Sequence, residues 1–261
     1  SQLRASSEMI DIISNKFLIL PQGGTAVGSG INAHKQFSHY FSQEITKLYP
    51  GKYKFIPSKN FYHELSSQDC SVQLSGELKN LAIILMKISN DLRWMNSGPL
   101  TGLSEIELKA LQPGSSIMPG KVNPVIPEAV AMASVDVIGN DASISIAAQS
   151  GSFQLNVMLP VIAYNLLKSI NLMAGSMSAL SQKAIKSFKV NAKHLETSLS
   201  KNPILVTALN PIIGYDSAAA IAKKAYRENR PIIDVASEET DIPIAKLKKL
   251  LDPTKLSKGG I

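Results

Sequence analysis

The stretch ELSSQDCSVQLSGELKNLAIILMKISNDLRWMN, from Glu64 to Asn96, contains no proline and repeats apolar residues at a helical spacing. Gaps of four and three residues alternate along it, an average of about 3.5 residues per repeat over three heptads. The repeating positions, called here the leucine seam, are Leu74, Leu78, Leu81, Leu85, Ile88, Leu92 and Met95. This spacing predicts a long helix in a left-handed bundle, with the seam as its core or as a surface for self-association, and the following NSGP predicts where the helix ends.

The segments after this helix indicate two more long helices. Between Ala129 and Leu167 the only charged residues are Asp136 and Asp141, so apolar residues surround the helix, which predicts burial on all sides. The polar break QSGSFQLN, at 149–156, divides this stretch from a second apolar helix that runs to about Lys186. Short buried strands at ASVDVIG and SISI are the alternative, because valine and isoleucine are frequent there.

The two ends of the chain differ in composition and in the length of their predicted helices. The first eighteen residues are typical of the end of another helix, whereas short amphipathic pieces and lysine-rich helix faces follow Val190. Asp216 and Asp241 are expected to cap two of these pieces. The sequence therefore predicts an all-α fold, with a central helical-bundle domain at 1–190 and a small helical C-terminal domain at 191–261.

The composition narrows the possible functions. The chain of 261 residues has a net charge of +7, but its lysines and arginines are scattered and only 6% of residues are aromatic, which argues against nucleic-acid binding. Cys70 is the one cysteine, so no internal disulfide is possible. No signal-peptide pattern and no uninterrupted apolar run of about 18 residues is found, which predicts a cytoplasmic or mitochondrial-matrix protein away from membranes. The low charged fraction of 18% favours an oligomer.

The polar loop PGSSIMPGKVNPVIPE, from Pro113 to Glu128, concentrates groups suited to an anion. Gly114 and Gly120 allow backbone N–H groups to converge, and a helix that begins just after the loop presents its positive end. Lys121 and Asn123 add a charge and amide donors, and the serines at 115 and 116 supply hydroxyls. The loop therefore predicts a carboxylate or phosphate site with a nucleophile or base at its rim. A glycine- and serine-rich turn without function is the alternative.

GSSIMPGKVNPVIPE resembles the signature loop of the fumarase/aspartase superfamily, and its KVNP is typical of the fumarase and aspartase branch. LVTALNPIIGYDSAAAIAKKA, at 205–225, and LMKISNDLRWMNSGP, at 85–99, look like class II fumarase. GGTAVGSGIN also fits, with Ser29 where the family usually has threonine. The resemblance covers essentially the whole chain. It implies the long-helix bundle of this superfamily with a small helical C-terminal domain.

The resemblance also implies an activity, the reversible anti addition of water to fumarate, giving L-malate through an aci-carboxylate intermediate in the tricarboxylic acid cycle. It implies no cofactor, no metal and a homotetramer whose active sites are shared between subunits. Aspartate ammonia-lyase is the alternative enzyme. The residues that match the family's catalytic positions are Ser115, as the base, and Glu128, as the partner of a histidine. Those that match substrate-binding positions are Ser116, Lys121, Val122 and Asn123.

The sequence departs from the family pattern upstream of the loop. The family carries an anion-binding segment and a segment with the catalytic histidine, and neither is found here. The four histidines do not match the catalytic one; they are His34, His39, His63 and His194. Glu128 therefore lacks its partner within this sequence, whereas Thr25 is expected near the substrate by analogy. A chain containing the N-terminal half would have to supply the missing groups, and a non-catalytic helical assembly fragment is the second alternative.

Overall fold

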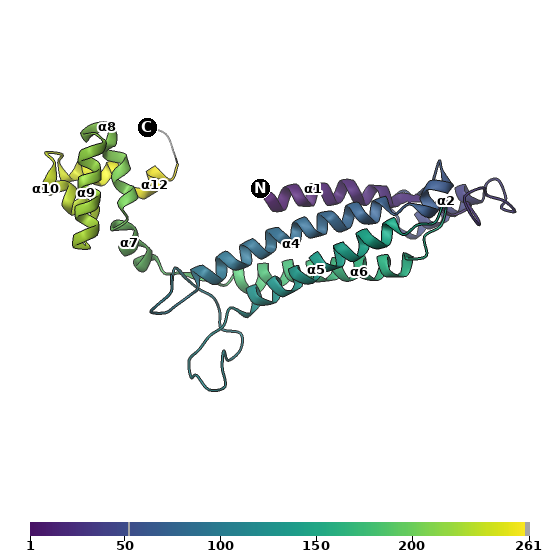
Figure 1. Ribbon diagram of the computed structural model, residues 1–261, viewed down its shortest axis with the longest axis horizontal. Helices are drawn as coiled ribbons and strands as arrows, with labels where there is room; N and C mark the ends of the chain where they lie inside the picture. The colour runs from purple at the N-terminus through teal and green to yellow at the C-terminus, as the bar shows by residue number, and fades with distance from the viewer. Residues whose placement is uncertain (52, 259–261) are drawn as a thin grey trace. The chain divides into compact units, whose positions relative to one another are not determined.

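The computed structural model describes residues 1–51 and 53–258, and these are mostly helical with very little sheet (Figure 1). They form two compact units. Unit 1 contains Ser1–Asn96 and Leu108–Phe188, and unit 2 contains Ser97–Glu107 and the chain from Lys189 onward. The all-α fold expected from the sequence is confirmed.

Unit 1 is an up-and-down bundle in which α1, α4, α5 and α6 run in alternating directions (Figure 1). The parallel pair of two-residue strands β1 and β2 lies between α1 and α4 in the sequence. The elements of unit 1 are α1 Gln2–Ser14, η1 Asn15–Leu18, β1 Ile19–Leu20, α2 Phe37–Leu48, β2 Ile56–Pro57, α3 Phe61–Ser66, α4 Asp69–Met95, α5 Val125–Gln149, α6 Leu159–Ala179 and the π-helical turn η2 Leu180–Ile185.

The leucine seam lies on α4 and forms the core of unit 1. Five of its seven residues are buried, because α1, α5 and α6 of the same chain pack against α4. Leu85 is 1% exposed and Leu81 is 3% exposed. The helix ends at Met95, immediately before the NSGP that predicts its end. The seam is therefore internal, and self-association of the chain requires another surface.

The helix predicted from Ala129 is α5, and it includes both segments for which strands were the alternative. Polar residues on its inner face are hydrogen-bonded to neighbouring helices. Asp141 accepts hydrogen bonds from Ser75 Oγ at 2.7 Å and from Lys79 Nζ at 2.6 Å, both on α4. Asn140 Nδ2 donates to Ser169 Oγ on α6 at 3.1 Å. Although α5 is long and apolar enough to cross a membrane by length and composition, these buried polar pairs are typical of a core helix in a bundle.

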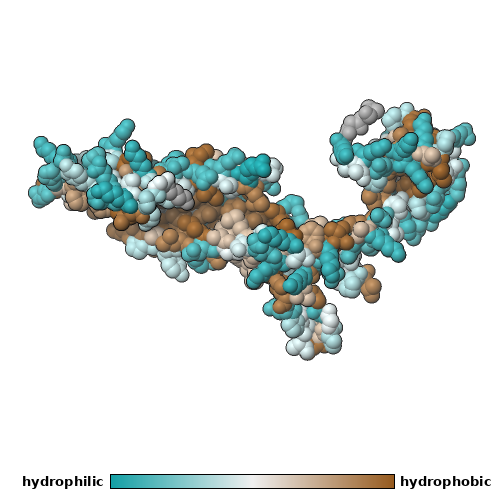
Figure 2. Space-filling view, turned by 180° about the vertical axis from the view of Figure 1, so that it is seen from behind, coloured by the Kyte–Doolittle hydropathy of each residue, from teal (hydrophilic) through white to brown (hydrophobic). Residues whose placement is uncertain are grey.

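One prediction for α5 is wrong, because the helix is not buried on all sides within a single chain. Its outer face exposes Met132, Val135 and Ile146, each by more than 60%. Tyr164 and Leu167 on α6 are exposed by 68% and 60%. Figure 2 shows apolar surface of this kind on the bundle. Unit 1 therefore has an apolar outer face on α5 and α6, which these five residues define.

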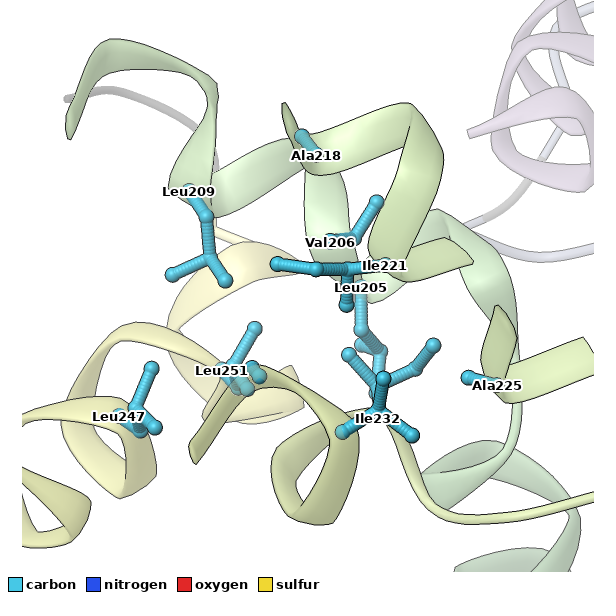
Figure 3. Close-up of a cluster of buried hydrophobic side chains, with 11 residues drawn as sticks. Leu205, Val206, Leu209, Ala218, Ile221, Ala225, Ile232, Leu247 and Leu251 are labelled. Carbon is cyan, nitrogen blue, oxygen red and sulfur yellow. The ribbon is translucent and has the colours of Figure 1, made fainter. Parts of the chain in front are cut away.

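Unit 2 packs short helices around a small core (Figure 3). Side chains from η3, α9, α10 and α11 point toward one another, and Leu209, Ile232 and Leu247 are completely buried. The elements of unit 2 are β3 Ile106–Glu107, β4 Lys189–Val190, α7 Ala192–Ser200, η3 Pro203–Leu209, α8 Asn210–Ile213, α9 Tyr215–Glu228, α10 Ile232–Glu239, α11 Ile244–Leu250 and α12 Pro253–Leu256. The antiparallel pairing of β3 with β4 explains why the segment 97–107 packs with unit 2.

Two predicted helix caps in unit 2 are wrong, although the helices exist. The residue that precedes α9 is Gly214, whose φ is +79°, so Asp216 lies in the first turn of that helix. The residue that precedes α11 is Pro243 and not Asp241. An aspartate in a first turn still interacts favourably with the helix dipole. The sequence pattern predicts that these helices exist, but the residue at which each one begins depends on local backbone geometry.

The substitution Leu85→Ala should lower the free energy of unfolding of unit 1 by about 2–5 kcal/mol, because it removes a buried side chain and leaves a cavity. The matched control is Ile83→Ala on the same helix, since Ile83 is 52% exposed. The control should stay within about 0.5 kcal/mol of the unchanged chain. Urea unfolding followed by the fluorescence of Trp94, the only tryptophan, measures both. Equal effects of the two substitutions would contradict the assignment of the seam to the core.

Candidate active site

The polar loop lies in the connection between α4 and α5. Residues 110–115 and 118–122, at the start of this loop and just before it, line an open depression of about 500 Å³. Ser115 and Lys121 both line it, and so does Gly114. The connection contains only one strand, of two residues, so the loop's shape depends on its own hydrogen bonds.

Backbone and side-chain hydrogen bonds close the loop into a ring. The Gly114 N–H donates to the Lys121 carbonyl at 2.9 Å, and Asn123 Nδ2 donates to the Gly114 carbonyl at 3.0 Å. Lys121 N–H donates to the Met118 carbonyl at 3.3 Å. A Cβ atom on Gly114 would lie 2.4 Å from the Lys121 carbonyl oxygen, so only glycine fits there. These contacts bring Ser115, Lys121 and Asn123 together in one small ring.

Ser115 has an unusual position inside this ring. Its Oγ accepts a hydrogen bond from the Ile117 N–H at 3.2 Å and another from the Met118 N–H at 3.1 Å. Two N–H donors directed at one oxygen stabilise negative charge on it. The sequence predicts that backbone N–H groups of the loop converge on an anion, but it does not show that two of them meet the serine itself. These two N–H groups are therefore placed where they would stabilise negative charge on the Ser115 oxygen.

The remaining predicted site residues surround the ring. Ser116, Lys121 and Val122 are exposed, whereas Asn123 is half-buried. Glu128 lies in the first turn of α5 and is half-buried, and its N–H donates to the Pro124 carbonyl as the helix begins. Because α5 starts at Val125, its positive end lies directly after the ring. The ring thus combines a cation, an amide and hydroxyls in a short stretch of chain, directly before a helix N-terminus, and this set of groups suits a small carboxylate.

Thr25 is not part of this arrangement within one chain. It lies in the segment between β1 and α2, which packs against α3 just before α4 begins, whereas the polar loop follows the other end of α4 (Figure 1). The 27 residues of α4 separate the two ends, and at about 1.5 Å per residue this is a distance of about 40 Å. A site that uses both Thr25 and Ser115 would need more than one chain.

The histidines and Cys70 do not join the ring. His34 Nδ1 accepts from the Gln36 N–H at 3.2 Å, and His63 Nε2 lies 3.6 Å from an oxygen of Asp69, so both have local partners. Partial burial raises the pKa of the Cys70 thiol, and nearby Glu64 acts in the same direction, so this residue stays a neutral thiol at pH 7. Within 1–51 and 53–258, no cluster of three or more histidine, cysteine or acidic side chains could hold a metal ion.

The substitution Gly114→Ala should open the ring, because the new Cβ collides with the Lys121 carbonyl. The collision should break about one of the hydrogen bonds that close the ring. Trypsin should then cleave after Lys121 about tenfold faster. The control is Gly139→Ala on α5, where no atom lies within 4 Å of the added Cβ. The control should leave the cleavage rate unchanged, and mass spectrometry of timed digests measures both rates. A Gly114→Ala variant cleaved no faster than the control would show that this ring does not exist in solution.

Comparison with known proteins shows which family this sequence resembles. A family model described as lyase matches residues 1–139, and a model described as fumarase C C-terminus matches residues 205–258. "Fumarate hydratase class II 2" of Pseudomonas aeruginosa is 60% identical over 260 residues, which is 100% of this chain and 56% of that protein. "Fumarate hydratase class II" of Xylella fastidiosa is 54% identical and is matched over 93% of this chain and 51% of its own length.

Solved structures give the same result. The fold is similar to that of a protein described as fumarate lyase:delta crystallin from Brucella melitensis bound to cobalt, with a TM-score of 0.91 and 36% identity over 98% of this chain and 55% of that one. A recombinant class II fumarase from Schistosoma mansoni gives a TM-score of 0.90 and 33% identity over 98% of this chain and 56% of that one. The chain thus spans about half the length of the curated relatives it matches. The last part of the chain is similar to the C-terminal region of fumarase C. Because the lyase model matches more than half of it, the chain belongs to the lyase family.

Proposed function

We propose that this chain supplies the base and substrate-binding loop of a class II fumarate hydratase, which interconverts fumarate and L-malate. The observation that carries the proposal is the ring around Ser115, in which two backbone N–H groups are directed at the serine oxygen. Lys121 and Asn123 belong to the same ring. The names of the relatives, among them the protein from Pseudomonas aeruginosa at 60% identity, support this choice of reaction.

In the proposed dehydration direction, the Ser115 oxygen takes the proton from C3 of L-malate. The electron pair of the broken C–H bond moves into the adjacent carboxylate and forms a doubly charged aci-carboxylate. Lys121 and the Asn123 amide stabilise this charge more strongly in the intermediate than in the substrate, which is the requirement for a higher rate. A pre-placed donor of this kind contributes about 3–4 kcal/mol. The C2 hydroxyl then leaves as water after a general acid protonates it, and fumarate remains.

The general acid is not assigned to a residue of this chain. The sequence resemblance places a catalytic histidine and a second anion-binding segment in a region outside this sequence, with Glu128 as the histidine's partner. A complete site accordingly combines the ring of one chain with groups from a polypeptide region that this sequence does not contain. We propose that the reaction uses no metal or cofactor. Lys121, Asn123 and the α5 N-terminus instead stabilise the negative charge of the intermediate.

We infer that the working form is a homotetramer with sites shared between subunits. Thr25 and the ring lie at opposite ends of the bundle, so a second copy in antiparallel orientation is the simplest way to bring them together. The apolar outer face on α5 and α6 supports such packing, since several large apolar side chains are more than half exposed on it and exposed apolar patches are typical of protein interfaces. The proposed setting is the cytoplasm, where the enzyme acts in the tricarboxylic acid cycle on small dicarboxylates.

The substitution Ser115→Ala should lower kcat for L-malate by about a hundredfold or more, because it removes the proposed base. The measurement uses this chain joined to the upstream segment of the Pseudomonas aeruginosa relative and follows the absorbance of fumarate. The control is Ser143→Ala, which removes an exposed hydroxyl on α5 that is bonded only to the Gly139 carbonyl. The control should keep full activity. Unchanged turnover in Ser115→Ala, with the chain still folded, would exclude this serine as the base.

Placing Glu at both Val135 and Leu167 should dissociate the assembly, because burying two carboxylates in an apolar interface is unfavourable. Sedimentation velocity of the 261-residue chain should show a tetramer that becomes smaller in the double variant. The control is Ile244→Glu, on an exposed apolar side chain of unit 2. It should leave the sedimentation coefficient unchanged. A monomeric unsubstituted chain, or a tetramer in the double variant, would contradict an interface on α5 and α6.

A further inference from the structure

Part of the segment that leads from α4 to the polar loop belongs to unit 2. The chain leaves α4 at Asn96, passes through unit 2 from Ser97 to Glu107, and returns to unit 1 at Leu108. The candidate site depression begins at Ala110, only two residues later. The path of residues 104–108 therefore determines where the loop starts.

Asn96 joins the two points at which the chain leaves and re-enters unit 1. Its Oδ1 accepts a hydrogen bond from the Leu108 N–H at 2.7 Å. Asn96 is half-buried and Leu108 is 6% exposed, so water does not readily replace this bond. The end of the rigid helix α4 is thereby fixed to the residue from which the loop departs.

Asn191 holds the residues just before Leu108. Its Nδ2 donates to the Ser104 carbonyl at 2.7 Å, and its backbone N–H donates to the Glu105 carbonyl at 2.9 Å. The strand pairing of β3 with β4 continues this contact through the next two residues. Four consecutive residues, 104–107, are consequently held by the chain around Asn191.

The ring itself has no comparable attachment at this end. Most of its side chains are exposed, with Ile117 at 83%, and the hydrogen bonds that close it lie within the loop and at Asn123. At its other end the loop continues directly into α5, which is anchored in the bundle. The chain on either side of the ring is thus held by α5 at one end and by the two asparagine contacts at the other.

We propose that Asn96 and Asn191 are positioning residues for the site: they hold the 104–108 segment and so restrain the chain that enters the Ser115 ring. This deepens the proposed function and rests on it for any effect on turnover. The two residues use opposite chemistry, since Asn96 acts as an acceptor and the Asn191 side chain acts as a donor. Aspartate can act as the acceptor at position 96. It cannot act as the donor at position 191, because an ionised carboxylate only accepts hydrogen bonds.

Hydrogen exchange of the full 261-residue chain tests the positioning role without substrate. Asn96→Ala and Asn191→Ala should each speed exchange at Leu108 and through 109–118 by about tenfold, the effect of losing roughly one hydrogen bond. Exchange in the middle of α4 and α5 should not change. Asn96→Asp should behave like the unsubstituted chain, whereas Asn191→Asp should behave like its alanine variant. Asn90→Ala is the matched control, since the Asn90 side chain accepts only from Arg93 on the same helix turn.

The result that overturns the proposal is unchanged loop exchange in both alanine variants, or faster exchange spread evenly over the bundle. Failure of aspartate to rescue position 96, or rescue at position 191, would also overturn it. In the chain joined to the relative's upstream segment, each alanine variant should lower kcat for L-malate about tenfold with little change in KM. If that assembly shows no turnover while the exchange pattern holds, the proposed function fails and the positioning of the ring stands.

Discussion

Burial of the leucine seam is the constraint on which the rest of unit 1 depends. Leu81 and Leu85 are almost completely covered by helices of the same chain, and this packing keeps α4 and α5 straight and antiparallel over their whole length. A rigid bundle has two distant ends. The segment that contains Thr25 precedes α3 and the start of α4, whereas the ring around Ser115 follows the end of α4. The long helices therefore make a single-chain site that uses both residues impossible.

The same packing determines how the ring is supported. Because α5 is fixed in the bundle by bonds such as Asp141 to Ser75, its N-terminus is a fixed point from which the ring projects. Buried polar pairs of this kind contribute alignment between helices, since a shifted register would leave Asp141 without a partner. The ring then adds only a few hydrogen bonds of its own, and these direct the Ile117 and Met118 N–H groups at the serine oxygen.

Much of the fold could be predicted from the sequence, because apolar spacing along α4 and the polar break at 149–156 report directly on helix packing. The groups of the candidate site were also visible, since the loop's residue types are chemically distinctive. Three features could not be predicted. The exposed face of α5 looks like core in composition, the starting residues of α9 and α11 depend on local angles, and the bonds of Asn96 and Asn191 join residues distant in sequence.

The most direct test of the central claim, that this chain provides one part of a fumarate hydratase site, is an absorbance assay with L-malate. The purified 261-residue chain is measured alone and after mixing with the separately expressed upstream segment of the Pseudomonas aeruginosa relative, and L-aspartate is assayed in parallel. Fumarate should form from L-malate in the mixture, the chain alone should form none, and L-aspartate should give no product. A folded mixture that forms no fumarate from L-malate, or that forms fumarate only from L-aspartate, would contradict the proposed function.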